Sequence, residues 1–228
     1  AVSFELEADR MRNLLLDETE FRKEVRVVME ERRLRTDDDP EAQLYEKFMA
    51  TAYQIHPYKD PIIGSMADLN RMTVVDLRAW YRRWYVPGNA TLVVVGDVRP
   101  NEVFKLARRH FGPVSSGVVE PVKIPPEPEQ KTPRRVRMSL PAEVPSLLMG
   151  YHVPVIGTDG VDWEPYALQV LTGVLDGGDS ARFVREIVRG QQIAAGLDTD
   201  YNPYSPFPVL LLFSATPANG HSSADVEK

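Results

Sequence analysis

A proline-rich stretch near the middle of the chain constrains its fold more than any other feature. The composition changes between Val114 and Arg134, where Glu, Lys and Gly surround five prolines, Pro121, Pro125, Pro126, Pro128 and Pro133. This composition predicts an extended, semi-rigid linker. We therefore expect two domains, at residues 1–115 and 135–228, joined by a linker at 116–134.

Composition excludes several classes of protein. The 228 residues carry a formal net charge of −6, which offers no general attraction to nucleic acid or to an anionic membrane. The chain has no cysteine, so disulfides and thiol catalysis are excluded. It contains no apolar run long enough to span a membrane, and its first residues lack the pattern of a signal peptide. Hydrophobic residues make up 43% of the chain, enough for a core.

The first half is expected to be mainly helical. Asp17 or Thr19 is a candidate N-cap, and Thr73 with Asp76 resembles a capping box. The β-branched run Ala90–Asp97 predicts a buried strand. We expect helices at residues 5–15, 41–53, 73–84 and 101–111. A further helix is expected from the cap at Asp17 or Thr19 to residue 35.

The second half repeats this mixture of elements. Strands are expected at 136–140, 147–153 and 209–215, and helices at 163–175 and 181–188. The fold class predicted is α+β, with two related α/β sandwich-like domains in which helices pack on a sheet. The first domain is expected to lack its N-terminal part and the second its C-terminal part.

Two glutamates in the helix after residue 17 could carry chemistry. Glu24 and Glu31 differ by seven positions, so they lie within about 20° of one helix face with their Cα atoms about 10.5 Å apart. Both would have to stretch to share one ion, which favours one as ligand and the other as a supporting acid. On spacing alone, a solvated helix face with i,i+4 ion pairs is the favoured alternative.

The chain resembles the pitrilysin/insulinase type of zinc metallopeptidase, including mitochondrial processing peptidases and their bacterial relatives. In the first half the matching pieces, in order, are ELEADRM, EFRKEVRVVMEERRLRTDDDP, HPY, PIIGSMADLNRMTVVDLRAWYRRWYVPGNATLVVVGDV and VFKLARRHFGPV. In the second half they are YALQVLTGVLDGGDSARFVREIVR and the final strand.

The resemblance implies a metal site. Family members bind zinc through H-x-x-E-H, whose glutamate is the general base, and through a glutamate far downstream. Matching assigns the downstream ligand to Glu31 and the supporting acid to Glu24. It also assigns substrate binding to Arg189, whose companion tyrosine is replaced by Gly196. Tyr201 or Tyr204 is a candidate substitute, and an exposed arginine at a helix end is the alternative for Arg189.

The chain departs from the family at the histidines. None of His56, His110, His152 and His221 belongs to H-x-x-E-H, and His56 is expected to pack in its loop. Only 30 residues precede Glu31, so the motif is expected upstream of Ala1. One carboxylate cannot hold a tetrahedral zinc ion. Zinc is therefore expected in the parent protein, with no tight binding and no hydrolysis by this fragment.

Two functions stay open at this stage. The first is a fragment of a zinc metalloendopeptidase that cleaves peptides or unfolded segments, located in the periplasm or otherwise in the cytoplasm. The second is a non-catalytic peptide-binding or structural partner of an active, homologous subunit. Exposed sheet edges would favour self-association of the fragment.

Overall fold

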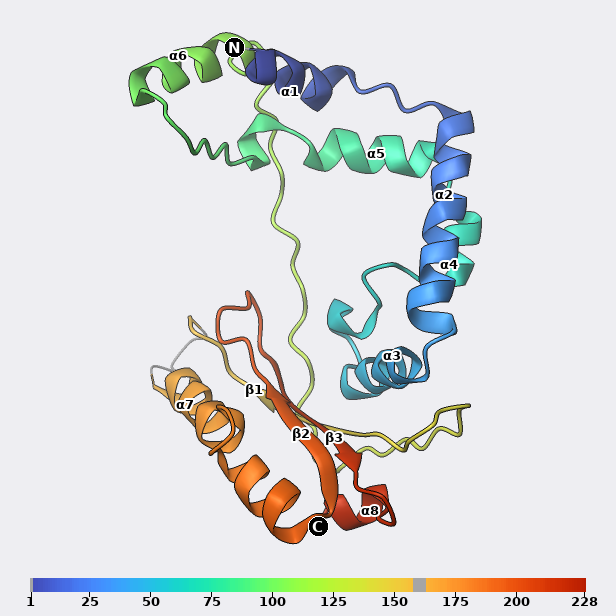
Figure 1. Ribbon diagram of the computed structural model, residues 1–228. Coiled ribbons are helices and arrows are strands. Elements are labelled where there is room, and N and C mark those ends of the chain that lie inside the picture. The colour runs from blue at the N-terminus through green and yellow to red at the C-terminus, as the bar shows by residue number, and fades with distance from the viewer. Residues whose placement is uncertain (1, 158–162) are drawn as a thin grey trace. The chain divides into compact units, whose positions relative to one another are not determined.

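The structure is a computed structural model that describes residues 2–157 and 163–228 (Figure 1). Its contacts define two compact units, which are described separately. The first comprises the chain up to Arg35 together with Asp60–Pro126, and the second comprises Thr36–Lys59 and Glu127–Lys228. A segment from the first half of the sequence therefore packs with the second half. The predicted domain boundaries at 115 and 135 stay a prediction.

The first unit is built from helices. They are α1 (Val2–Asn13), α2 (Glu18–Arg32), α4 (Met66–Arg71), α5 (Val74–Trp84) and α6 (Pro100–His110). Asp17 is the N-cap of α2, because its carboxylate accepts the backbone N–H groups of Thr19 and Glu20 at 2.8 and 3.0 Å. The predicted capping box of Thr73 and Asp76 is confirmed at the start of α5.

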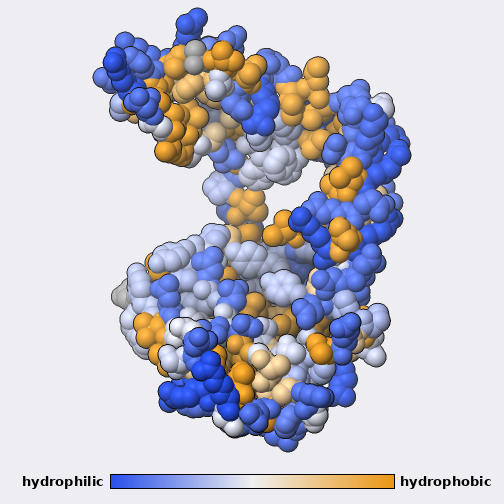
Figure 2. Space-filling model, viewed as in Figure 1, coloured by the Kyte–Doolittle hydropathy of each residue, from blue (hydrophilic) through white to orange (hydrophobic). Residues whose placement is uncertain are grey.

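The α-helix α2 ends in a π-helical segment, Arg33–Asp37. In the first unit α1 lies beside α6, and α2 beside α4 (Figure 1). Figure 2 shows hydrophobic side chains at the surface over α1 and α6, where Leu6 and Phe104 are exposed. These helices therefore carry apolar groups that this unit does not bury.

The predicted strand at residues 90–97 is wrong. The segment forms no strand, and Val93 and Val95 are 74% and 92% exposed. A strand needs a neighbouring strand for its backbone hydrogen bonds, and the described residues of this unit contain none. A short 3-10 turn, Pro87–Asn89, directly precedes this segment.

The second unit contains the sheet. Strands β1 (Leu147–Val153), β2 (Ala194–Asp200) and β3 (Val209–Pro217) pair antiparallel in the order β1-β3-β2, so β1 and β2 are the edges. The predictions of β1 and β3 are confirmed, whereas β2 was not predicted. The strand expected at 136–140 is wrong, since this segment has no strand assignment.

Helices pack against this sheet and close its core. They are α3 (Pro40–Ala52), α7 (Glu164–Asp176), the π-helical segment η4 (Phe183–Gln191) and α8 (Ser223–Val226). The buried core is formed by Ala194, Leu197, Ala215 and Val226, against which Phe183, Ile187 and neighbouring residues pack. The combination of helices with an antiparallel sheet confirms the α+β class.

Candidate functional site

The two candidate glutamates lie on one uninterrupted helix, α2. The Glu24 side chain is exposed. The Glu31 side chain is 41% exposed, and its Oε1 lies 2.9 Å from Nη1 of Arg35. Neighbouring acids of α2 form similar local pairs, such as Glu18 with Arg22 at 2.5 Å. These pairs agree with the solvated-face alternative for much of this helix.

The side chains present do not form a metal centre by themselves. Among residues 2–157 and 163–228, no three His, Cys, Asp or Glu side chains gather closely enough to hold an ion. A protein zinc site takes at least three such ligands. Glu31 therefore supplies one carboxylate at most, and the remaining donors must come from other polypeptide if zinc binds here.

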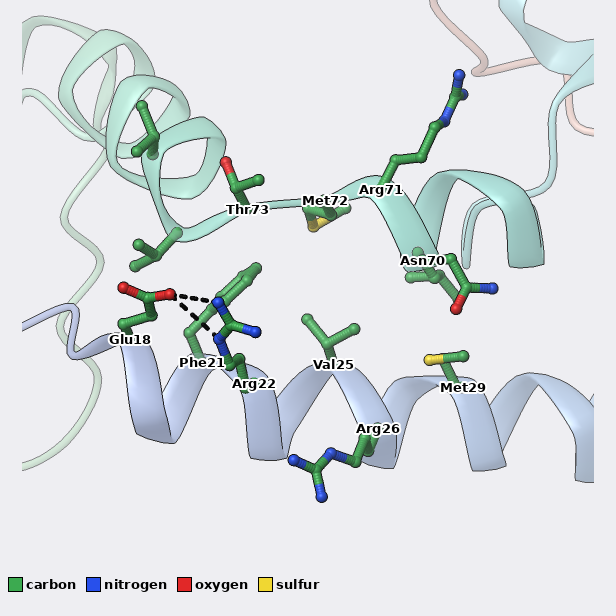
Figure 3. Close-up of a pocket in the computed structure, with 13 residues that line it drawn as sticks. Glu18, Phe21, Arg22, Val25, Arg26, Met29, Asn70, Arg71, Met72 and Thr73 are labelled. Carbon is green, nitrogen blue, oxygen red and sulfur yellow. Dashed lines mark hydrogen bonds and ion pairs between the residues drawn. The ribbon is translucent and has the colours of Figure 1, made fainter.

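Sequence reasoning missed an open hollow beside α2. It has a volume of about 640 Å³ and is bounded by α2, by α4 and by the start of α5. Phe21, Val25 and Met29 follow one another at helical spacing along its α2 side. Val25 and Met29 point toward the α4–α5 segment, whereas Arg26 points away (Figure 3). Neither Glu24 nor Glu31 lines this hollow, so it is separate from the predicted site, and its lining combines apolar side chains with polar ones such as Arg22 and Asn70.

Arg189 lies in η4 of the second unit, whereas Glu31 belongs to the first. Its side chain is 64% exposed, and Nη2 lies 3.7 Å from Oδ1 of Asp179, whose side chain is 96% exposed. The two tyrosines that were candidate companions of Arg189 have different surroundings. The Tyr201 hydroxyl donates to the Pro154 carbonyl at 2.7 Å, while Tyr204 is exposed.

The prediction that His56 packs in its loop is confirmed. Its side chain is buried, and its ring contacts the rings of Tyr53, Tyr58 and Phe207. The ring Nδ1 accepts the backbone N–H of Tyr58 at 3.2 Å. No pattern in the sequence indicated that Glu127, in the proline-rich linker, contacts this same turn.

Comparison with known proteins identifies the class. A family described as "Peptidase M16 inactive domain" matches residues 71–227, more than half of the chain. The chain therefore belongs to the peptidase M16 inactive-domain family. No described helix is both long and apolar enough to cross a membrane.

Individual relatives agree with this assignment. The zinc protease PqqE of Helicobacter pylori is 35% identical over 196 residues, which cover 85% of this chain and 43% of the relative. A protease from Helicobacter pylori of known structure has a TM-score of 0.84 at 32% identity, over 99% of this chain and 54% of that one. The chain thus spans less than half of the length of the first of these relatives.

The fold extends to a more distant protein. The periplasmic protease PqqL from Escherichia coli has a TM-score of 0.69 at 18% identity, and the match covers 95% of this chain and 24% of that one. At this identity the likeness concerns the fold alone.

Proposed function

We propose that this chain is part of a zinc-dependent metalloendopeptidase that cleaves peptides or unfolded protein segments. The observation that carries the proposal is the pair Glu24 and Glu31 on one helix of a peptidase M16 family chain. A relative named zinc protease covers 85% of the chain, which supports the same activity.

Glu31 is the proposed carboxylate ligand and Glu24 the supporting acid. The Glu31–Arg35 pair lies at the surface, and exposed pairs contribute only about 0–1 kcal/mol. The Glu31 carboxylate can therefore leave Arg35 for a metal ion at little cost. Histidine donors would come from polypeptide outside this chain, since none of its histidines belongs to H-x-x-E-H.

Arg189 is the proposed substrate-binding residue of the second domain. Its pair with Asp179 is long and exposed, so the guanidinium remains available to donate to carbonyl groups of an extended peptide. Such peptides are commonly held by strand addition at a sheet edge. The edge strands β1 and β2 belong to the same unit as Arg189.

The test uses the intact parent protein. Bound zinc per chain and hydrolysis of a quenched peptide are measured for the wild type, Glu31→Gln, Glu24→Gln and the control Glu30→Gln. Loss of the ligand in Glu31→Gln is expected to abolish both zinc and hydrolysis, while Glu30→Gln retains both. Glu24→Gln is expected to weaken metal affinity by about 10–100-fold. Full zinc content in Glu31→Gln would refute the assignment.

A second candidate function is a non-catalytic peptide-binding or structural subunit. The family description itself favours it, because the matched residues 71–227 correspond to a domain described as inactive. In this case the parent binds no zinc, yet it binds peptides and raises the activity of a homologous partner. Peptide affinity that falls in Arg189→Ala, without any bound zinc, would support this function over the first.

The proposed location is the periplasm, and the cytoplasm is the alternative. The support is the fold shared with PqqL, which is described as a periplasmic protease. Osmotic-shock fractionation of the tagged parent protein tests the location. Recovery with a cytoplasmic marker enzyme would contradict it.

A further inference from the structure

The carboxylate of the linker residue Glu127 binds the turn that follows α3. Its carboxylate accepts the consecutive backbone N–H groups of Gln54, Ile55 and His56, the last two at 2.9 Å each. Three N–H donors on one carboxylate form charge-assisted bonds, which are stronger than neutral ones. A side chain about 70 positions away in the sequence therefore closes the end of this helix.

Two further side chains hold the carbonyl groups just before this turn. Arg134 Nη1 donates to the Thr51 and Ala52 carbonyls at 2.9 and 3.0 Å. The Nε2 atom of His152, on β1, lies 3.1 Å from the Ala52 carbonyl. Hydrogen bonds thus connect both ends of residues 51–56 to other parts of the second unit. We call Glu127, Arg134 and residues 51–56 the linker clasp.

The imidazole of His56, the last residue of this clasp, bonds to the backbone of the turn that follows. Because Nδ1 accepts the Tyr58 N–H, the neutral ring carries its proton on Nε2. That buried Nε2 has no hydrogen-bond partner among the residues described by the structure. The ring is enclosed by Tyr53, Tyr58 and Phe207 instead.

We propose that His56 makes the linker clasp acid-sensitive: a neutral ring holds the His-Pro-Tyr turn closed, and protonation opens the turn and releases the linker from α3. The reason is geometric. A second ring proton would sit on Nδ1, which would then face the Tyr58 N–H as a donor rather than accept from it. The inference does not depend on zinc or on peptidase activity.

Burial of the ring supports the same direction, whereas the charge of Glu127 opposes it. Burial lowers the pKa of His56, and the nearby Glu127 carboxylate, which raises it, is the smaller effect. For Glu127, burial raises the pKa, but the three backbone hydrogen bonds together lower it, and the charge of His152 lowers it further. Tyr53 and Tyr58 are the other titratable groups that contact the ring, and burial raises the pKa of Tyr53. Phe207 is uncharged.

The sign of the pH dependence follows from these shifts. Folding lowers the pKa of His56 from its ordinary value of 6.5. The contribution of this ring to the stability of the closed clasp is therefore fully present above pH 6.5. This contribution is lost as the pH falls from 6.5 toward the lowered value. The stabilisation from Glu127 is present above the ordinary pKa of a glutamate and is lost only at lower pH.

Hydrogen exchange of the whole chain tests the proposal. Protection of the Gln54, Ile55, His56 and Tyr58 amides, corrected for intrinsic exchange, is compared on the two sides of the ordinary histidine pKa. Between pH 6.5 and about 5.5 we expect protection to fall by up to about tenfold. The reason is that the ratio of protonated to neutral imidazole in the open form rises about tenfold for each unit by which the pH falls. In His56→Asn, whose side-chain oxygen can still accept the Tyr58 N–H, protection is expected not to vary over this range.

Two controls separate the clasp from general acid sensitivity. His221→Asn removes an exposed histidine of the same unit and is expected to keep the wild-type response. Glu127→Gln is expected to lower protection of the three amides at every pH, whereas Glu129→Gln in the same linker is not. Should His56→Asn fail to fold, NMR titration of the His56 ring in the wild type must give a pKa below 6.5. Protection that is independent of pH, or a His56 pKa at or above 6.5, would overturn the inference.

Discussion

The ring of Phe48 on α3 occupies the space directly over Gly150 on β1. A Cβ atom at position 150 would lie 2.7 Å from Cζ of Phe48 and 3.2 Å from a methyl group of Leu212. Helix α3 therefore approaches the sheet at a place where the strand has no side chain. This contact, together with the linker clasp, associates residues 36–59 with the second unit.

Gly150→Ala is expected to destabilise the second unit. The added methyl group forces Phe48 or the strand to move, and overpacking of this kind costs about 1–3 kcal/mol. Urea unfolding followed by circular dichroism gives the free energy of unfolding. Phe48→Leu combined with Gly150→Ala should recover part of the loss. Gly173→Ala is the control, because nothing lies near the added Cβ on α7, and it is expected to stabilise by about 0.5–1 kcal/mol.

The capping box at the start of α5 predicts a second stability effect. Thr73→Ala removes the hydroxyl that caps the helix, which typically costs about 1 kcal/mol. Fluorescence of Trp80 and Trp84, which lie in α5, reports unfolding of this unit in a Trp163→Phe background, because Trp163 belongs to the second unit. Thr73→Ser retains the hydroxyl and is expected to behave like the wild type.

This effect should weaken in acid. The side-chain hydrogen bond from Thr73, followed by the backbone one, lowers the pKa of Asp76 below its ordinary 3.8. The stabilisation is therefore present above pH 3.8 and is lost as the pH falls through the lowered value. A difference between Thr73→Ala and Thr73→Ser that stays constant into strong acid would contradict this coupling.

The extended segment 90–97 is expected to drive self-association of this chain. Its valines are exposed and the described part of this unit offers no neighbouring strand, so the segment is able to add to a strand of another copy. Light scattering should show assemblies whose size increases with concentration. Val93→Lys with Val95→Lys should reduce them, whereas Leu15→Lys, at a residue 91% exposed outside the segment, should not. A monomer at all concentrations would count against this expectation.

Zinc titration of this chain by calorimetry is expected to show no tight site, and hydrolysis of a peptide substrate should stay at background. The reason is the ligand set, since the described residues contain no group of three suitable side chains. Hydrolysis that a chelator abolishes would contradict this expectation.

Local chemistry in the sequence was sufficient for the longer α-helices and for two strands, whereas the short helices α4 and α8 were not predicted. Asp17 and the Thr73–Asp76 box mark helix starts because caps act over three residues. Strands β1 and β3 were predicted from apolar runs. In contrast, β2 has small and acidic residues, Ala194–Asp200, and its pairing with β3 makes it a strand. The more β-branched segment 90–97 has no such neighbour.

The candidate site also combines features that the sequence determines with features that it does not. The sequence by itself determined that Glu24 and Glu31 share a helix face, since helical spacing fixes their relation. Only the tertiary structure decided that Glu31 pairs with Arg35, that Arg189 is exposed beside Asp179, and that Glu127 closes the turn after α3. The physical reason is that side-chain partners, and above all those distant in the sequence, depend on how the whole chain folds, whereas caps and helical faces depend on a few adjacent residues.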